Sequence, residues 1–171
     1  MNFIVAVDEN WNIGKGGKLL QPIPEDLKQF KSKTMGKVVV LGRKTLSTFP
    51  GKKPLAGRIN IILTRQKDFF IEPSLICHSF TELFALLSLF KDDDIFIIGG
   101  GEIYKKMIPY CKVGYVTKIH KTYPADTGII NLDHEENWKI IKKDGPHHFQ
   151  NDIYYTFLEY YNTKVMPITQ K

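Results

Sequence analysis

Short apolar runs without any alternation constrain the fold of this chain more than any other feature. Six of them, rich in valine, isoleucine and leucine, recur along its 171 residues. Strands with one solvated face alternate apolar and polar residues, whereas strands covered on both faces are apolar throughout. The pattern therefore predicts a buried, mostly parallel sheet. The six predicted strands lie at residues 3–7, 38–41, 59–63, 75–77, 95–98 and 114–119.

Segments with helical character separate these runs, as connections between parallel strands require. An apolar stripe at helical spacing is clearest in the third of them. The aromatic segment 154–161 is β-prone and is expected to pair with 114–119 as an antiparallel edge. The predicted helices lie at residues 24–34, 44–48, 81–90 and 102–108.

These elements predict one α/β domain over residues 1–163, followed by a loose tail at 164–171. Its centre is expected to be a mostly parallel, twisted sheet of about eight strands with an antiparallel C-terminal edge. About four helices are expected to flank the sheet. Ligand-binding loops are then expected at the carboxyl ends of the parallel strands.

Composition argues against a membrane span and gives the surface a positive charge. Apolar runs reach about six residues, whereas a span needs about 20. No long apolar segment follows Met1, so we expect a cytoplasmic protein. The net charge of +6 favours anionic partners, such as phosphate cofactors, polycarboxylates or nucleic acid. Basic residues are dispersed and form no nucleic-acid motif, so charge gives nucleic acid only weak support.

Cysteine and histidine are too scattered to indicate a metal site. Cys77 and Cys111 lie outside any CxxC or Cys/His cluster, and we expect two reduced, partly buried thiols. His147 and His148 follow a Gly-Pro pair and are expected to lie in a loop. No metal is therefore predicted.

The start of the first predicted helix carries the first candidate catalytic group. Pro24 suits a first helical turn, and Glu25 and Asp26 suit the positive end of the helix dipole. That dipole role is the simplest interpretation of the two acids. Leu27 and Phe30, however, mark the face expected to turn inward, with Asp26 at its edge. A partly desolvated carboxyl has a raised pKa and can donate a proton or bind an amidine-like edge.

Two strand ends carry cations and hydroxyls that suit a phosphate group. Arg43, Lys44 and Thr45 follow one predicted strand, and Thr64 and Arg65 follow the next. If the two strands are neighbours, these side chains converge at one edge of the sheet. The cluster would then select the terminal phosphomonoester of NADPH over NADH. A solvated basic turn at each strand end is the alternative interpretation.

Three consecutive glycines, Gly99, Gly100 and Gly101, join a buried strand to a helix. Without Cβ atoms they let a ligand approach the backbone near a helix start, although the GxGxxG spacing is absent. The glycine-rich segment 12–20 can act as a lid. Arg58, placed just before a strand, can clamp a carboxylate. The ordinary alternatives are a flexible loop and a solvated arginine.

In this order and spacing, the segments resemble the dihydrofolate reductase family over residues 4–159. The family implies hydride transfer from NADPH to 7,8-dihydrofolate by a monomer that antifolates inhibit and that supports one-carbon metabolism. It also implies a cis peptide between Gly99 and Gly100. The segments that carry the resemblance are residues 13–14, 23–31, 41–45, 54–64 and 97–104.

The resemblance also implies roles for individual residues. Asp26 would hold the pterin N3 and 2-amino group and promote protonation at N5, and Thr117 would hydrogen-bond with it. Arg58 would clamp the α-carboxylate of the glutamate tail. The walls around the pterin and aminobenzoyl rings would be Val5, Ala6, Leu27, Phe30, Leu55 and Ile98. The cofactor would contact Ala6, Ile13, Gly14, Leu19, Gly42, Arg43, Lys44, Thr45, Leu63, Thr64, Arg65, Ile98, Gly99, Gly100, Gly101, Glu102, Ile103, Tyr104 and Thr127.

One departure from the family pattern concerns Gln21, which stands where the family usually has tryptophan. Its amide can hydrogen-bond water near Asp26, but the flat apolar wall is lost. We therefore expect altered proton delivery or altered affinity for diaminopyrimidine antifolates. A lesser departure is Ala125, in a loop that often has glycine and supports the lid.

Two other functions compete with this interpretation. A riboflavin-pathway reductase would share the fold and NADPH, but the helix with Asp26 and the position of Arg58 favour folate. A non-catalytic basic module would bind oligonucleotides in a salt-sensitive way and would not consume NADPH.

Overall fold

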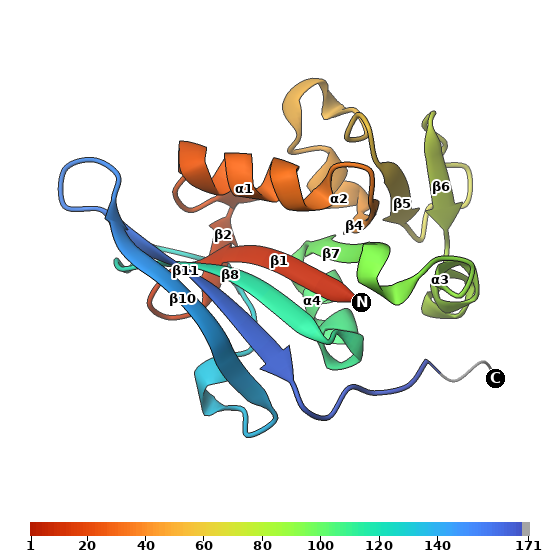
Figure 1. The fold of residues 1–171 in the computed structure, drawn as a ribbon. Helices are drawn as coiled ribbons and strands as arrows, with labels where there is room; N and C mark the ends of the chain where they lie inside the picture. Colours follow the sequence, from red (N-terminus) through yellow and green to blue (C-terminus); the bar gives the residue numbers. More distant parts are fainter. Residues whose placement is uncertain (169–171) are drawn as a thin grey trace.

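The computed structural model describes residues 1–168, and its centre is an eight-stranded sheet (Figure 1). The strand order is β10-β11-β8-β1-β7-β4-β5-β6, and the six strands from β8 to β6 run parallel. Each predicted apolar run forms one of these six strands. They are β1 (Asn2–Val7), β4 (Val38–Gly42), β5 (Ile59–Leu63), β6 (Ser74–Cys77), β7 (Ile95–Gly99) and β8 (Val113–Ile119).

Burial on both faces explains why these strands do not alternate. Along β1, Phe3 and Val5 enter one hydrophobic core while Ile4 enters another on the opposite face. Helices α3 (Phe80–Leu87) and α4 (Gly101–Met107) pack on the first face. Helices α1 (Pro24–Thr34) and α2 (Arg43–Leu46) lie on the other (Figure 1). The predicted α/β architecture is therefore confirmed, with four α-helices in the described residues.

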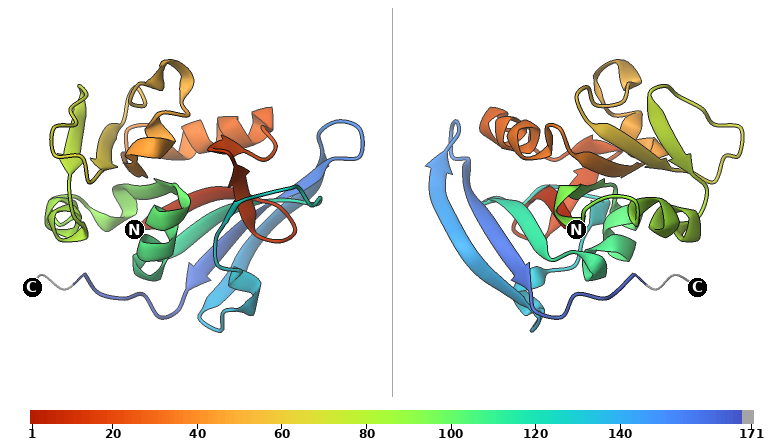
Figure 2. Two further views of the ribbon diagram at one scale, coloured as in Figure 1. Left: turned by 180° about the vertical axis from the view of Figure 1, so that it is seen from behind. Right: turned by 45° about the vertical axis from the view of Figure 1, so that its right-hand side comes forward.

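The antiparallel edge consists of a long ribbon, β10 (Trp138–His148) and β11 (Tyr154–Asn162), which Figure 2 shows curving away from the parallel strands. The pairing of β11 with β8 is as predicted. Strand β10 was not predicted because its lysines and exposed Ile140 and Ile141 give no apolar run. Lysine-rich sequence is typical of an edge strand that avoids further pairing.

The loop predicted for His147 and His148 is wrong, because both residues lie in β10 and pair with β11. The Gly-Pro pair before them falls at a register shift between Asp144 and His147. Proline is tolerated within a sheet at such a bulge and on an edge strand. The sequence signal for a turn therefore marks an irregularity inside one strand.

Helix boundaries differ from the predictions by one to three residues, except in α1, which has the predicted bounds. Helix α3 starts at Phe80 because the Ser79 side chain accepts a hydrogen bond from the Glu82 amide and caps it. It ends at Leu87, before Leu89, which is 76% exposed. The apolar stripe had extended the prediction too far.

A small second sheet covers the carboxyl end of β1. It contains β2 (Asn12–Lys15), β3 (Lys18–Leu19) and β9 (Thr127–Gly128), in the order β3-β2-β9. We call these three strands the lid sheet. The glycine-rich segment expected to act as a lid is thus an ordered hairpin that pairs with a segment more than a hundred residues away.

The first part of the expected tail lies against the domain. The Met166 amide donates to the Pro109 carbonyl at 3.0 Å, and Ile168 packs against the core that contains Phe3. The last residues of the tail, 169–171, lie outside the described part of the chain. Within residues 1–168, no helix has the length and apolar character of a membrane span.

Candidate active site

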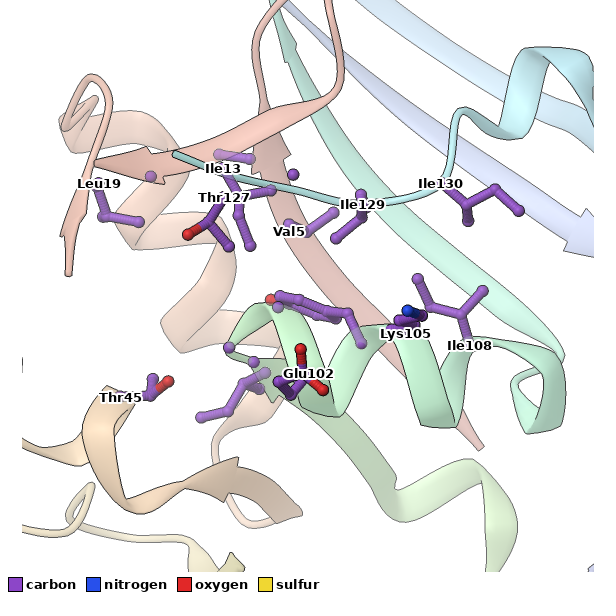
Figure 3. A pocket seen from close by; sticks show the side chains of 18 of the residues that line it. Val5, Ile13, Leu19, Thr45, Glu102, Lys105, Ile108, Thr127, Ile129 and Ile130 are labelled. Carbon is purple, nitrogen blue, oxygen red and sulfur yellow. The ribbon is translucent and has the colours of Figure 1, made fainter. Parts of the chain in front are cut away.

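A cavity of about 1100 Å³ opens between the lid sheet, the carboxyl ends of β1 and β7, and helices α2 and α4. Figure 3 shows Ile13, Leu19 and Thr127 of the lid sheet on one side of it, with Thr45 and Glu102 on the other. Its position is the one expected for a ligand in an open α/β sheet. The predicted site residues that line it are Val5, Ala6, Ile13, Gly14, Leu19, Lys44, Thr45, Ile98, Gly99, Gly100, Gly101, Glu102, Tyr104 and Thr127.

The other predicted residues lie outside the lining of this cavity. Gln21 lies just before α1, and the rest fall into two groups. One group extends the site along the carboxyl ends of β4 and β5 and onto α4. The other belongs to α1, β8 and the loop before β5. The first group is Gly42, Arg43, Leu63, Thr64, Arg65 and Ile103, and the second is Asp26, Leu27, Phe30, Leu55, Arg58 and Thr117.

Asp26 is held between α1 and the centre of the sheet. The hydroxyl of Thr117, 1% exposed on β8, donates a hydrogen bond of 2.5 Å to Asp26 Oδ1. Burial raises the pKa of the Asp26 carboxyl, and the hydrogen bond from Thr117 opposes this rise only in part. Thr117 pairs with Ala6 of β1, which lines the cavity. Asp26 is therefore a partly dehydrated acid next to the cavity.

The inward face of α1 differs from the predicted one. Leu27 is 49% exposed, whereas Ile23 and Thr34 are buried and Asp26 and Phe30 are half-buried. Asp26 thus lies on the inward face itself, and Leu27 lies beside it. Adjacent residues differ by about 100° around a helix, so the pattern did not distinguish which of the two turns inward.

Arg58 is anchored at the opposite end of α1. Its Nη1 donates to the Thr34 hydroxyl at 3.1 Å and its Nε donates to the Ala56 carbonyl at 3.0 Å. Asp26 and Thr34 are separated by eight residues of one helix, or about 12 Å along its axis. The helix therefore sets a fixed distance between the Asp26 carboxyl and the point at which the Arg58 guanidinium is anchored.

The basic strand ends converge as predicted. Gly42 of β4 is in register with Leu63 of β5, so Arg43 and Thr64 leave the sheet side by side. Arg65 follows as an exposed side chain. His78, which was not predicted, follows β6 at the same edge, with its Nδ1 3.0 Å from the Thr64 carbonyl oxygen.

The glycine turn packs so closely that side chains have no room. Gly99 has φ of 114°, in the region that only glycine adopts readily, and its peptide bond to Gly100 is cis, as the resemblance implied. A Cβ on Gly101 would lie 2.6 Å from Thr127 Cγ2 of the lid sheet. The turn therefore brings bare backbone to the cavity wall.

Asp126 fastens the lid sheet. Its carboxylate accepts hydrogen bonds from the Gly16 amide at 2.8 Å and the Thr127 hydroxyl at 2.9 Å. Its own amide donates to the Gly14 carbonyl at 3.1 Å. The amide of Gly16, and then the hydroxyl of Thr127, lower the pKa of Asp126.

Several residues of the site were not predicted. Lys18 and Thr48 line the cavity, and buried Asn60 holds the loop before β5 by accepting from the Leu55 amide and donating to the Leu55 carbonyl. Polar residues of this kind have no periodic signal. An asparagine inside an apolar strand, as in Asn60-Ile61-Ile62, is the one hint that the sequence offered.

Gln21 precedes α1, and its Nε2 donates to the neighbouring Pro22 carbonyl at 3.0 Å. Within residues 1–168, no hydrogen bond joins Gln21 to Asp26. The expected effect of Gln21 on proton delivery therefore stays a prediction.

This site combines an open α/β sheet, a cavity of about 1100 Å³ at the carboxyl ends of its strands and a partly dehydrated acid. The combination is typical of enzymes that bind a nucleotide cofactor. The family model for dihydrofolate reductase matches residues 1–162. Dihydrofolate reductase of Bacillus subtilis is 33% identical over 161 residues, which are 94% of this chain and 93% of the relative. That of Staphylococcus haemolyticus is 37% identical over 143 residues, 82% of either chain.

A solved structure agrees with the sequence relatives. Dihydrofolate reductase from Enterococcus faecalis, complexed with NADP(H) and RAB-propyl, superposes with a TM-score of 0.82 at 35% identity. The match covers 94% of this chain and 95% of the other. The chain belongs to the dihydrofolate reductase family.

Proposed function

We propose that this protein reduces 7,8-dihydrofolate to 5,6,7,8-tetrahydrofolate with NADPH and so supports one-carbon metabolism. The observation that carries the proposal is the dehydrated Asp26 carboxyl, bonded to Thr117, beside a cavity that can take a dinucleotide. The proposed compartment is the cytoplasm, with which the free, buried thiols of Cys77 and Cys111 are compatible.

The residues around the cavity suit NADPH. Its volume of about 1100 Å³ lies at the upper end of ligand pockets. The glycine turn offers backbone where a Cβ would collide, and Lys44 and Thr45 lie on the facing wall. Arg43 and Arg65 at the strand ends would pair with the 2′-phosphate. When bound, the cofactor supplies a hydride from nicotinamide C4 to pterin C6.

Helix α1 would position the substrate at both ends. The Asp26 carboxylate would accept hydrogen bonds from the pterin N3 and 2-amino group, with Thr117 fixing one of its oxygens. Arg58 would bind the α-carboxylate of the glutamate tail about 12 Å further along the helix. The exposed Leu27 and half-buried Phe30 and Leu55 would contact the rings between them.

Asp26 would also assist the proton transfer that the reaction needs. Because burial raises its pKa, the carboxyl binds a proton more readily than a solvated aspartate and can promote protonation at pterin N5, directly or through water. The lid sheet would exclude bulk water from the nicotinamide side. Water exclusion at this point protects the hydride and strengthens the charge interactions of Asp26 with the pterin.

Absorbance of NADPH at neutral pH, followed with dihydrofolate present, tests the proposal. We expect NADPH loss that depends on dihydrofolate and matches the tetrahydrofolate formed. Arg43→Ala and Arg65→Ala should each raise KM for NADPH about tenfold and leave KM for NADH nearly unchanged. A purified, folded protein that consumes no NADPH with dihydrofolate would refute the proposed function.

Gln21 is proposed to modify proton delivery or antifolate affinity. Gln21→Trp would restore a flat apolar wall near α1 in place of an amide. We expect a change in kcat or in the inhibition constant of a diaminopyrimidine antifolate. If both stay as in the wild type, Gln21 has no such role.

A further inference from the structure

The side chain of Asp8, directly after β1, is fully buried and accepts an unusual number of backbone hydrogen bonds. Its Oδ1 accepts from the amides of Asn10 and Asn12, both at 2.9 Å. Its Oδ2 accepts from the Tyr123 amide at 3.1 Å and from the Asn12 side-chain amide at 3.4 Å. A buried carboxylate with this many N–H donors fixes the backbone that supplies them.

These donors belong to the two segments that lead into the lid sheet. Residues 8–12 form the turn before β2, closed by the Asp8 amide donating to the Asn12 carbonyl at 3.0 Å. Tyr123 lies on the segment between β8 and β9. Within the turn, Trp11 has φ of 60° and is buried, a conformation that a large side chain adopts only when its surroundings hold it.

Both segments continue directly into the cavity wall. Ile13 and Gly14 of β2 line the cavity, as does Thr127 of β9. The Trp11 carbonyl accepts a hydrogen bond from the Ile129 amide at 2.9 Å, so the turn also fixes the chain after β9. Thr127 in turn packs on Gly101 at the glycine turn. A shift of the turn therefore moves the wall on which the cofactor would lie.

We propose that Asp8 is a positioning residue of the active site. Its carboxylate joins the two segments that lead into the lid sheet and thereby sets the position of the cofactor-binding wall. Asp8 itself does not line the cavity. The inference rests on the proposed function only for its kinetic readout. Cofactor affinity tests it independently.

Asp8→Asn tests the proposal, because it keeps the shape but replaces one acceptor oxygen by a donor that faces N–H groups. We expect KM and Kd for NADPH to rise about tenfold. KM for dihydrofolate and the folded fraction by circular dichroism should change less than about twofold. Asp94→Asn is the control. It removes an acid that pairs with Lys37 at the amino ends of β7 and β4, outside the cavity lining, and it should leave both KM values unchanged.

Asn12→Asp is a second variant, for use if Asp8→Asn does not fold. It places a like charge against the Asp8 carboxylate without changing size, and the same rise in KM for NADPH is expected. An unchanged Kd for NADPH, or equal changes in both KM values, would overturn the proposal. If the wild type shows no turnover, the proposed function fails, and the Kd of NADPH, from its fluorescence, still decides the role of Asp8.

Discussion

Asp26 at the start of α1 and Asp126 at the lid sheet are the same side chain in opposite environments. Asp26 lies against the sheet with one hydroxyl donor, from Thr117, and burial raises its pKa. Asp126 is exposed, accepts from the Gly16 amide and the Thr127 hydroxyl, and its pKa is lowered. The first environment favours a carboxyl that binds a proton, and the second favours a permanent anion that holds backbone in place.

The difference shows which feature makes an acid chemically useful in this fold. Both aspartates are close to the cavity, so location alone does not separate them. Burial with few hydrogen-bond donors raises the proton affinity of Asp26, as its proposed role requires. Backbone donors at the surface give Asp126 a structural role. Changing one residue at each place should therefore give effects of different size and kind.

Replacing Asp26 should have the largest effect. Asp26→Asn keeps the shape but cannot bind a proton, so kcat at neutral pH should fall about 100-fold or more. The loss should shrink at low pH, where the substrate is already protonated. Glu25→Gln is the control, because Glu25 is an exposed acid in the same helical turn that pairs with Lys28 at 2.8 Å. Steady-state kinetics of both variants across pH measure the effect, and an equal loss in the two would contradict the assigned role of Asp26.

Removing the Thr117 hydroxyl should have an intermediate effect. Thr117→Val takes away a hydroxyl donor that opposes the effect of burial on Asp26, so the pKa of Asp26 should rise further. The midpoint of the pH–rate profile should move to higher pH, and kcat/KM for dihydrofolate should fall about tenfold as the carboxylate loses its orientation. Thr117→Ser, which keeps the hydroxyl, should restore most of the activity. A downward shift of the profile in Thr117→Val would be inconsistent with this geometry.

Replacing Asp126, which holds the lid sheet, should change cofactor binding rather than the chemical step. Asp126→Asn weakens the acceptor for the Gly16 amide, and KM for NADPH should rise about fivefold while the midpoint of the pH–rate profile stays constant. Initial rates at varied NADPH measure this. A shifted midpoint would mean that the two aspartates are not separate in function.

The smallest effect concerns stability, and it should have opposite signs at the two sites. A lowered pKa in the folded state gives Asp126 a stabilising contribution that is present at neutral pH and lost as pH falls through that pKa. A raised pKa means that ionised Asp26 destabilises the fold as pH rises. At neutral pH, Asp126→Asn should lower Tm and Asp26→Asn should raise it, each by a few degrees at most. Thermal unfolding at neutral and acid pH measures both changes in Tm. Changes of the same sign in the two variants at neutral pH would contradict the comparison.

The sequence predicted the parts of this molecule that burial dictates. Both faces of the parallel sheet are covered, so each central strand is an apolar run. The predicted cofactor-binding residues after Val40-Leu41 and Ile97-Ile98 follow from strand ends that meet at one edge of the sheet. The resemblance supplied the proposed roles of Asp26 and Arg58, which stay predictions. The cis peptide after Gly99 was also implied by the family and is present.

Features made by polar contacts between distant segments were not predictable in this way. The lid sheet joins residues 12–19 to 127–128 through hydrogen bonds that leave no periodic pattern. Strand β10 is exposed and lysine-rich, and its Gly-Pro pair imitates a loop. The inward face of α1 was misassigned by one residue, because the apolar pattern placed Leu27 inward where the structure places its neighbour in sequence, Asp26. Asp8 carries no sequence signal that separates it from other acids at strand ends.

The side-chain carboxyl titration of Asp26, followed by ¹³C NMR and assigned with Asp26→Asn, tests the central claim most directly. The dehydrated carboxyl should titrate above the ordinary aspartate range, while Asp126 in the same spectra should titrate below it. If Asp26 titrates at or below the ordinary range, the carboxyl is solvated, and the proposed proton chemistry of this site is wrong.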